Sequence, residues 1–224
     1  MAGANADLLK LDLGGYDQLT CGVVSDWMEA AGGKTTDPNR YGIVTSATPA
    51  TITFNPTVNF QTTSRIGALR FTGAAALHFN PTASSYNTYR LRNQISTTTG
   101  PLTISAGTLK FSDGAGWGGS SNVVVNGTGT LEVQAGSVDT MFGANGAYTC
   151  LSLEDSGKID IPSGSEVKVR WLRVDGRYLP RGKYGPAGSG EGVNTAYASH
   201  FTAGGGVLNV RSAYPSNGTS LYLR

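Results

Sequence analysis

The chain has 224 residues, a length that suits one domain or one elongated stack of repeats. Glycine supplies 32 residues and only 14% of the chain is charged, against about 25% in a typical soluble domain, so the composition argues against a helical bundle. The net charge of +2 comes from scattered basic residues, which argues against a dedicated nucleic-acid-binding protein, and no apolar run approaches the ~20 residues of a transmembrane helix.

The first 35 residues are expected to cap the N-terminal end of the fold. Residues 23–31 form the one helix-like stretch and contain Trp27, with Ser25 and Asp26 as candidate N-caps. We expect this stretch to cover the end of the core that follows.

Residues 36–170 are expected to form the repeat turns and hold most copies of one short pattern, in which a polar residue lies between two apolar residues. Because side chains alternate between the two faces of a strand, each copy predicts a short, half-buried strand. The copies are Leu11-Asp12-Leu13, Ile52-Thr53-Phe54, Leu77-His78-Phe79, Leu109-Lys110-Phe111, Leu131-Glu132-Val133, Ile159-Asp160-Ile161 and Leu208-Asn209-Val210.

The spacing of these copies indicates a β-solenoid rather than an antiparallel sandwich, because sandwich strands do not usually repeat one pattern in register. If each copy begins one turn and the long last step, from Ile159 to Leu208, spans two, we expect roughly eight to nine turns, with intermediate strands such as Leu102-Thr103-Ile104 in a second sheet. The polar residues would then form one ladder, in which Lys110 pairs with Glu132 and Glu132 repels Asp160. The full expected ladder is Asp12, Thr53, His78, Lys110, Glu132, Asp160 and Asn209.

Residues 8–170 resemble the autotransporter-associated β-strand repeats. The resemblance rests on Leu11 to Gln18, Ile43 to Phe54, Gly100 to Phe111 and Asn122 to Leu131. It implies a right-handed parallel β-helix that serves as a stalk or scaffold in a large secreted or surface-attached bacterial protein. We therefore expect a larger parent polypeptide, with an export signal outside this sequence.

Residues 171–224 are expected to form a C-terminal capping unit, because the open end of a solenoid exposes unpaired backbone groups. The segment from Leu172 to Gly185 resembles the closing unit of such repeats. Together these regions predict an all-β, right-handed parallel β-helix with capped ends, in a single domain of residues 1–224.

Catalytic chemistry has little support in the sequence. The densest charged set alternates with apolar residues and is interpreted as a solvated outer face, while His78 and His200 have no nucleophile or acid at an informative spacing. Cys21 and Cys150 lie far apart in the sequence and do not form a metal-binding motif. A disulfide between them is an open alternative. We expect no metal and no cofactor. The charged set is Glu154, Asp155, Lys158, Asp160, Glu166, Lys168 and Arg170.

Aromatic residues are the better candidates for a binding surface, because their ring faces suit the C–H groups of sugars. Trp117, which is flanked by glycines, is the first candidate, whereas Trp171 continues the phase of Val167 and Val169 and is expected to point inward. The other candidates for glycan binding are Tyr86, Tyr89, Tyr178 and Tyr184, with Tyr197 nearby.

The sequence therefore predicts a non-catalytic structural or presentation module of a secreted or cell-surface protein. The first alternative is a carbohydrate-binding module attached to a polysaccharide-degrading enzyme. The second is a polysaccharide lyase or glycoside hydrolase, which requires a groove with convergent carboxylates and a base.

Overall fold

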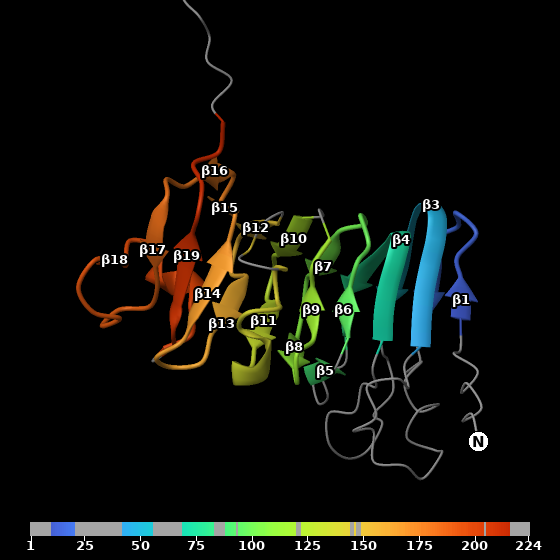
Figure 1. Ribbon diagram of the computed structural model, residues 1–224, viewed down its shortest axis with the longest axis horizontal. Coiled ribbons are helices and arrows are strands. Elements are labelled where there is room, and N and C mark those ends of the chain that lie inside the picture. Colours follow the sequence, from blue (N-terminus) through green and yellow to red (C-terminus); the bar gives the residue numbers. More distant parts are fainter. Residues whose placement is uncertain are drawn as a thin grey trace, which may run out of the picture.

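The protein is a parallel β-solenoid of about four turns, as a computed structural model shows (Figure 1). The structure describes residues 10–20, 42–55, 69–82, 88–92, 94–119, 122–143, 146, 149–203 and 205–215. The expected all-β parallel β-helix is confirmed, whereas the expectation of eight to nine turns is wrong. The expected helical cap around Trp27 lies outside the described residues.

The main face of the coil is a nine-stranded sheet in the order β1-β3-β4-β7-β10-β12-β15-β16, with β2 also paired to β3. Its strands are β1 (Lys10–Asp12), β2 (Gln18–Thr20), β3 (Gly42–Phe54), β4 (Leu69–Phe79), β7 (Leu102–Ile104), β10 (Asn122–Val125), β12 (Cys150–Leu153), β15 (Trp171–Val174) and β16 (Arg177–Tyr178). All pairs in this sheet are parallel except β15 with β16.

The second face is a four-stranded parallel sheet that follows the main face along the chain. It consists of β5 (Thr88–Arg92), β8 (Thr108–Ser112), β11 (Thr130–Val133) and β13 (Lys158–Asp160). Phe201 continues it through a parallel bridge to Ile159.

The third side of the coil lies between the second face and the next strand of the main face. Its strands are β6 (Ile95–Ser96), β9 (Gly116–Trp117), β14 (Glu166–Val169), β17 (Gly182–Tyr184), β18 (Val193–Asn194) and β19 (Val207–Val210). Two short 3₁₀ turns, Ala135–Ser137 and Ala198–His200, complete the described elements. Within these residues, no helix has the length and apolarity needed to cross a membrane.

The three sides of the coil divide the repeated sequence copies among different sheets. Leu77, Leu102, Val123, Leu151 and Leu172 are in register on the main face, at steps of 21 to 28 residues. Leu109, Leu131 and Ile159 are in register on the second face, and Leu208 lies on the third side. The sequence copies therefore lie in different turns and on different sides of the coil, and the single polar ladder expected from them is wrong.

Part of that ladder is nevertheless correct on the second face. Lys110 and Glu132 are register neighbours, with Nζ 2.8 Å from Oε1. Asp160 follows Glu132 in register, as expected, and its carboxylate accepts a hydrogen bond from the Thr202 hydroxyl. Each carboxylate thus has a partner of its own, which offsets the repulsion between them.

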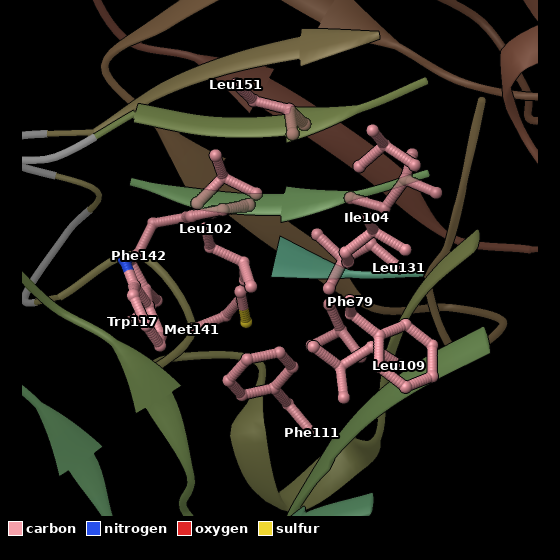
Figure 2. Close-up of a cluster of buried hydrophobic side chains, with 14 of the residues drawn as sticks. Phe79, Leu102, Ile104, Leu109, Phe111, Trp117, Leu131, Met141, Phe142 and Leu151 are labelled. Atoms are coloured by element: carbon pink, nitrogen blue, oxygen red, sulfur yellow. The ribbon is translucent and has the colours of Figure 1, made fainter. Parts of the chain in front are cut away.

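Apolar side chains from all three sides fill the interior (Figure 2). Leu102 and Ile104 of the main face point toward Leu109 of the second face, and Met141 and Trp117 close the third side (Figure 2). All five side chains are at most 1% exposed. The in-register stacking of similar residues allows each turn to bury its apolar side against the next.

The C-terminal end of the coil is closed by antiparallel strands. After β15 the chain reverses at Asp175 and Gly176, whose φ angles are 45° and 78°, and returns as β16. Two positive φ angles in a two-residue Asp-Gly loop are the signature of a type I′ hairpin. The hairpin thus interrupts the parallel stacking on the main face by a change of strand direction.

Candidate functional site

Most aromatic residues predicted to bind glycans lie in the core, and Trp117 is the clearest correction. Its ring is 0% exposed and lies 5.1 Å from the Phe71 ring between centroids. Its indole N–H donates a hydrogen bond to the Gly100 carbonyl oxygen at 3.3 Å. The neighbouring glycines allow the backbones of adjacent turns to approach, since a Cβ at Gly116 would lie 2.1 Å from the Thr140 oxygen. A glycan has no access to this ring.

The tyrosines predicted to bind glycans differ in their exposure to solvent. Tyr89 is buried, with its ring centroid 5.5 Å from that of Phe54 and 5.1 Å from that of Phe79. Tyr184 is buried as well, and its hydroxyl donates to the Pro180 carbonyl oxygen at 2.8 Å. Tyr86 lies outside the described residues, so Tyr178 is the predicted residue that the structure places on the surface.

Tyr178 belongs to a surface group that we call the aromatic cluster, which consists of Trp171, Tyr178 and Tyr214. Tyr178 and Tyr214 are stacked, with centroids 3.6 Å apart and planes inclined by 11°. The Trp171 ring meets Tyr214 edge to face at 5.4 Å. Because Tyr178 is 40% and Tyr214 42% exposed, the cluster presents ring surface to solvent.

Three separate segments bring these rings together. Trp171 begins β15, and the Asp175-Gly176 hairpin sets Tyr178 opposite Arg173. The chain after β19 then runs past the start of β15, because the Ser212 N–H donates to the Arg170 carbonyl oxygen at 3.1 Å. Tyr214 follows two residues later and reaches both other rings.

Trp171 points outward, contrary to the prediction that it continues the inward phase of Val167 and Val169. The bend at Arg170 separates β14 from β15 and shifts the alternation, so Leu172 and Val174 become the buried positions. Trp171 then lies in the same outward register as Cys150 and Asn122. The apolar residues at 172 and 174 were the signal in the sequence that could have revealed this change.

Charged groups surround the cluster. The Arg170 guanidinium lies over the Trp171 ring, 4.2 Å from its centroid. The Arg173 guanidinium is already paired with Glu154, at 2.8 Å from Nη2 to Oε1. The second oxygen of Glu154 accepts the Gly176 N–H at 3.0 Å, which ties the hairpin to the preceding turn.

The polar groups beneath the rings are held in their neutral forms. Burial, followed by a hydrogen bond with Tyr214, raises the pKa of Tyr178 to about 12. Burial also raises the pKa of the Cys150 thiol, which interacts with Ser152 and Tyr178. Because a protonated thiol is a poor nucleophile, Cys150 is not suited to covalent catalysis at neutral pH. Cys150 is a free cysteine, and Cys21 lies outside the described residues.

The charged set considered for catalysis is divided among the sides of the coil. Glu154 pairs with Arg173 on the main face, and Asp160 bonds Thr202 on the second face. Glu166 on the third side pairs with Lys183 at 2.7 Å and accepts a hydrogen bond from Asn209. Among the described residues, no three His, Cys, Asp or Glu side chains gather to form a metal site.

Both histidines make local structural contacts. His78 Nε2 lies 2.9 Å from the Ser105 hydroxyl oxygen, and burial lowers the pKa of the imidazole. The buried His200 has Nδ1 2.9 Å from the Gly157 carbonyl oxygen and Nε2 3.5 Å from a carboxylate oxygen of Asp175. These contacts join neighbouring turns at the corners of the coil.

Comparisons with known proteins find no relative of this chain. No protein family, curated protein or solved structure matches the chain.

Proposed function

We propose that the chain is a non-catalytic structural or presentation module of a larger secreted or cell-surface protein. The observation that carries this proposal is the continuous core, in which aligned apolar residues of successive turns are buried. Such a stack holds whatever precedes and follows it at a set separation, because each turn rests on its neighbours.

The distribution of charge agrees with a structural role. Each side of the coil has a carboxylate paired with a cation of a neighbouring segment: Lys110 with Glu132, Arg173 with Glu154 and Lys183 with Glu166. A lyase or glycoside hydrolase needs carboxylates and a base that converge on one substrate. The separation of Glu154, Asp160 and Glu166 onto three sides favours the structural role over these enzymes.

A release assay tests the absence of catalysis. The purified chain is incubated with a panel of neutral and acidic polysaccharides, and both reducing ends and the ultraviolet absorbance of unsaturated sugars are followed. We expect neither signal to rise above that of a heat-denatured sample. Release that disappears in a Glu154→Gln, Asp160→Asn or Glu166→Gln variant that keeps its fold would overturn the proposal.

Surface labelling tests the location. An antibody against the chain should label intact cells of the source organism, and external protease should remove the signal. Label that appears only after the cells are permeabilised would contradict a secreted or cell-surface module.

A further inference from the structure

Two arginines lie beside the aromatic cluster in adjacent turns. Val169 and Val210 are in register between β14 and β19, and the Arg211 N–H donates to the Val169 carbonyl oxygen at 2.9 Å. Arg170 and Arg211 therefore follow paired positions. Arg170 directly precedes Trp171, and Arg211 lies three residues before Tyr214. Each of these two aromatic residues thus has an arginine close to it in the sequence.

Among the described residues, these two arginines have no carboxylate partner. Within the part of the chain that the structure describes, no carboxylate lies within ion-pair distance of Arg170 or Arg211, whereas Arg173 has Glu154 as its partner. The Arg170 guanidinium instead lies over the Trp171 ring. Two unneutralised guanidinium groups in adjacent turns favour the approach of an anion, because a planar guanidinium binds a carboxylate through two hydrogen bonds.

The aromatic rings supply the complementary apolar surface. Tyr178 and Tyr214 are each about two-fifths exposed although they are stacked on one another, and Trp171 extends the ring surface along β15. The apolar C–H face of a sugar ring packs well against such surfaces. The rings and the arginines together match a ligand that has apolar ring faces and a negative charge on each unit.

We propose that the aromatic cluster, together with Arg170 and Arg211, binds a carboxylated polysaccharide. The pyranose rings pack against Tyr178, Tyr214 and Trp171, and the uronate carboxylates bind the two guanidinium groups. A polymer suits this cluster, since its rings come from β15, β16 and the segment after β19 and so offer separate contacts to successive sugars. This role goes beyond structural support, because it attaches the module to an acidic glycan.

The test uses two polymers with the same backbone. The full chain is run by affinity electrophoresis through gels that contain either polygalacturonate or its highly methyl-esterified form, which lacks most of the carboxylate charge. Alginate provides a second carboxylated polymer, and dextran sulfate tests whether charge alone is sufficient. The variants are Tyr214→Ala and Arg211→Gln, and the matched controls are Tyr16→Ala, at a 75% exposed tyrosine far from the cluster, and Arg181→Gln, at an exposed arginine of the C-terminal cap.

We expect retardation by a carboxylated polymer and little retardation by the esterified form. Tyr214→Ala should raise the dissociation constant at least about tenfold, the equivalent of 1.4 kcal/mol. Arg211→Gln should weaken binding and reduce its dependence on salt, since fewer charges are screened. The two controls should bind as the unaltered chain does, and all four variants should keep the melting temperature within a few degrees.

Several outcomes would overturn the inference. These are an absence of binding to both carboxylated polymers, equal binding to the esterified form, binding to dextran sulfate alone, or unchanged affinity in both Tyr214→Ala and Arg211→Gln. Arg211→Gln removes the charge of an exposed side chain and leaves a polar one, so it stays informative if the aromatic variant unfolds. Release of sugars from a bound polymer would contradict the non-catalytic proposal and leave the binding site intact, so the two failures are distinguishable.

Discussion

Trp117 and Trp171 illustrate how differently one residue type behaves at two positions of this coil. Trp117 fills the third side of the interior beside Phe71, whereas Trp171 lies on the outside beneath Tyr214 (Figure 2 shows Trp117 within the core). Glycines flank Trp117, and this pattern is compatible with either environment. Burial at this position is decided by the adjacent turns, which contribute Phe71 and Met141.

Alanine substitutions should distinguish the buried Trp117 from the partly exposed Trp171. Trp117→Ala should lower the free energy of unfolding by about 3–5 kcal/mol, because it removes a fully buried ring and leaves a cavity. Trp171→Ala should cost about 1 kcal/mol, since its ring is partly exposed. Chemical denaturation followed by circular dichroism measures both. Equal losses in the two variants would show that the assignment of inside and outside is incorrect.

At the scale of elements, glycine sets how closely successive turns approach. A Cβ at Gly129, which precedes β11, would lie 2.3 Å from the Ile104 carbonyl oxygen of the preceding turn. A Cβ at Gly164 would have no atom within 4 Å, although its φ of 73° is strained for other residues. The first glycine is required by the stacking of turns and the second by local backbone conformation alone.

The two glycines therefore predict different responses to alanine. Gly129→Ala should destabilise the protein by more than 2 kcal/mol, an order-of-magnitude figure for overpacking against backbone. Gly164→Ala should cost about 1 kcal/mol, the strain of a left-handed conformation. Thermal melting of both variants decides this, and a larger loss at Gly164 would contradict the close approach at Gly129.

The C-terminal strands depend on one carboxylate of β14. Glu166 accepts a hydrogen bond from Asn209 of β19 and pairs with Lys183 of β17. The hydrogen bond with Asn209, and next the one with Lys183, lowers the pKa of Glu166 below its ordinary value of 4.5. The folded state thus binds this proton less readily than the unfolded state does.

This shift gives the cap a pH dependence of known sign. Glu166 should contribute its full stabilisation above the unfolded pKa of 4.5 and lose it as the pH falls through the lower folded pKa. Glu166→Gln should therefore melt at a lower temperature than the unaltered chain at neutral pH, and the difference should narrow in acid. Glu191→Gln, at an exposed carboxylate, is the control and should show no such narrowing. A constant difference at all pH values would rule out this role for Glu166.

On the scale of the whole molecule, the protein is a one-dimensional stack in which each turn contacts its neighbours. β1 and β3 lie at one end of the described main face, and β15 and β16 lie at the other (Figure 1). Stability in such stacks is approximately a sum of the stabilities of the turns and of the contacts between neighbours. A defect at one end should therefore be felt less at the other end.

Leu172→Ala tests this independence. Leu172 is 0% exposed in the last parallel strand of the main face, so the substitution should destabilise that turn by about 2–5 kcal/mol. Native-state hydrogen exchange should then show faster exchange in β12, β15 and the C-terminal strands, with protection in β3 and β4 retained. Equal acceleration at both ends would show that the coil unfolds as a single cooperative unit.

The repeated apolar-polar-apolar pattern by itself determined that the protein is a stack of short strands. Each copy after the first, in which Leu11 is exposed, buries both apolar residues and leaves the polar one partly exposed. This alternation holds on every side of the coil, as at Leu77, Leu131 and Leu208. The ion pair between Lys110 and Glu132 was also predicted, because their copies are consecutive on one face.

Only the tertiary structure decided which side of the coil each copy occupies. The pattern is the same on all three sides, so it gives neither the number of turns nor the partners of each strand. The tertiary structure also decided the aromatic cluster of Trp171, Tyr178 and Tyr214. A bend at Arg170, a hairpin at Gly176 and the return of the chain after β19 bring the three rings together. Positions so far apart in sequence become neighbours through chain reversal, which alternation within a strand does not encode.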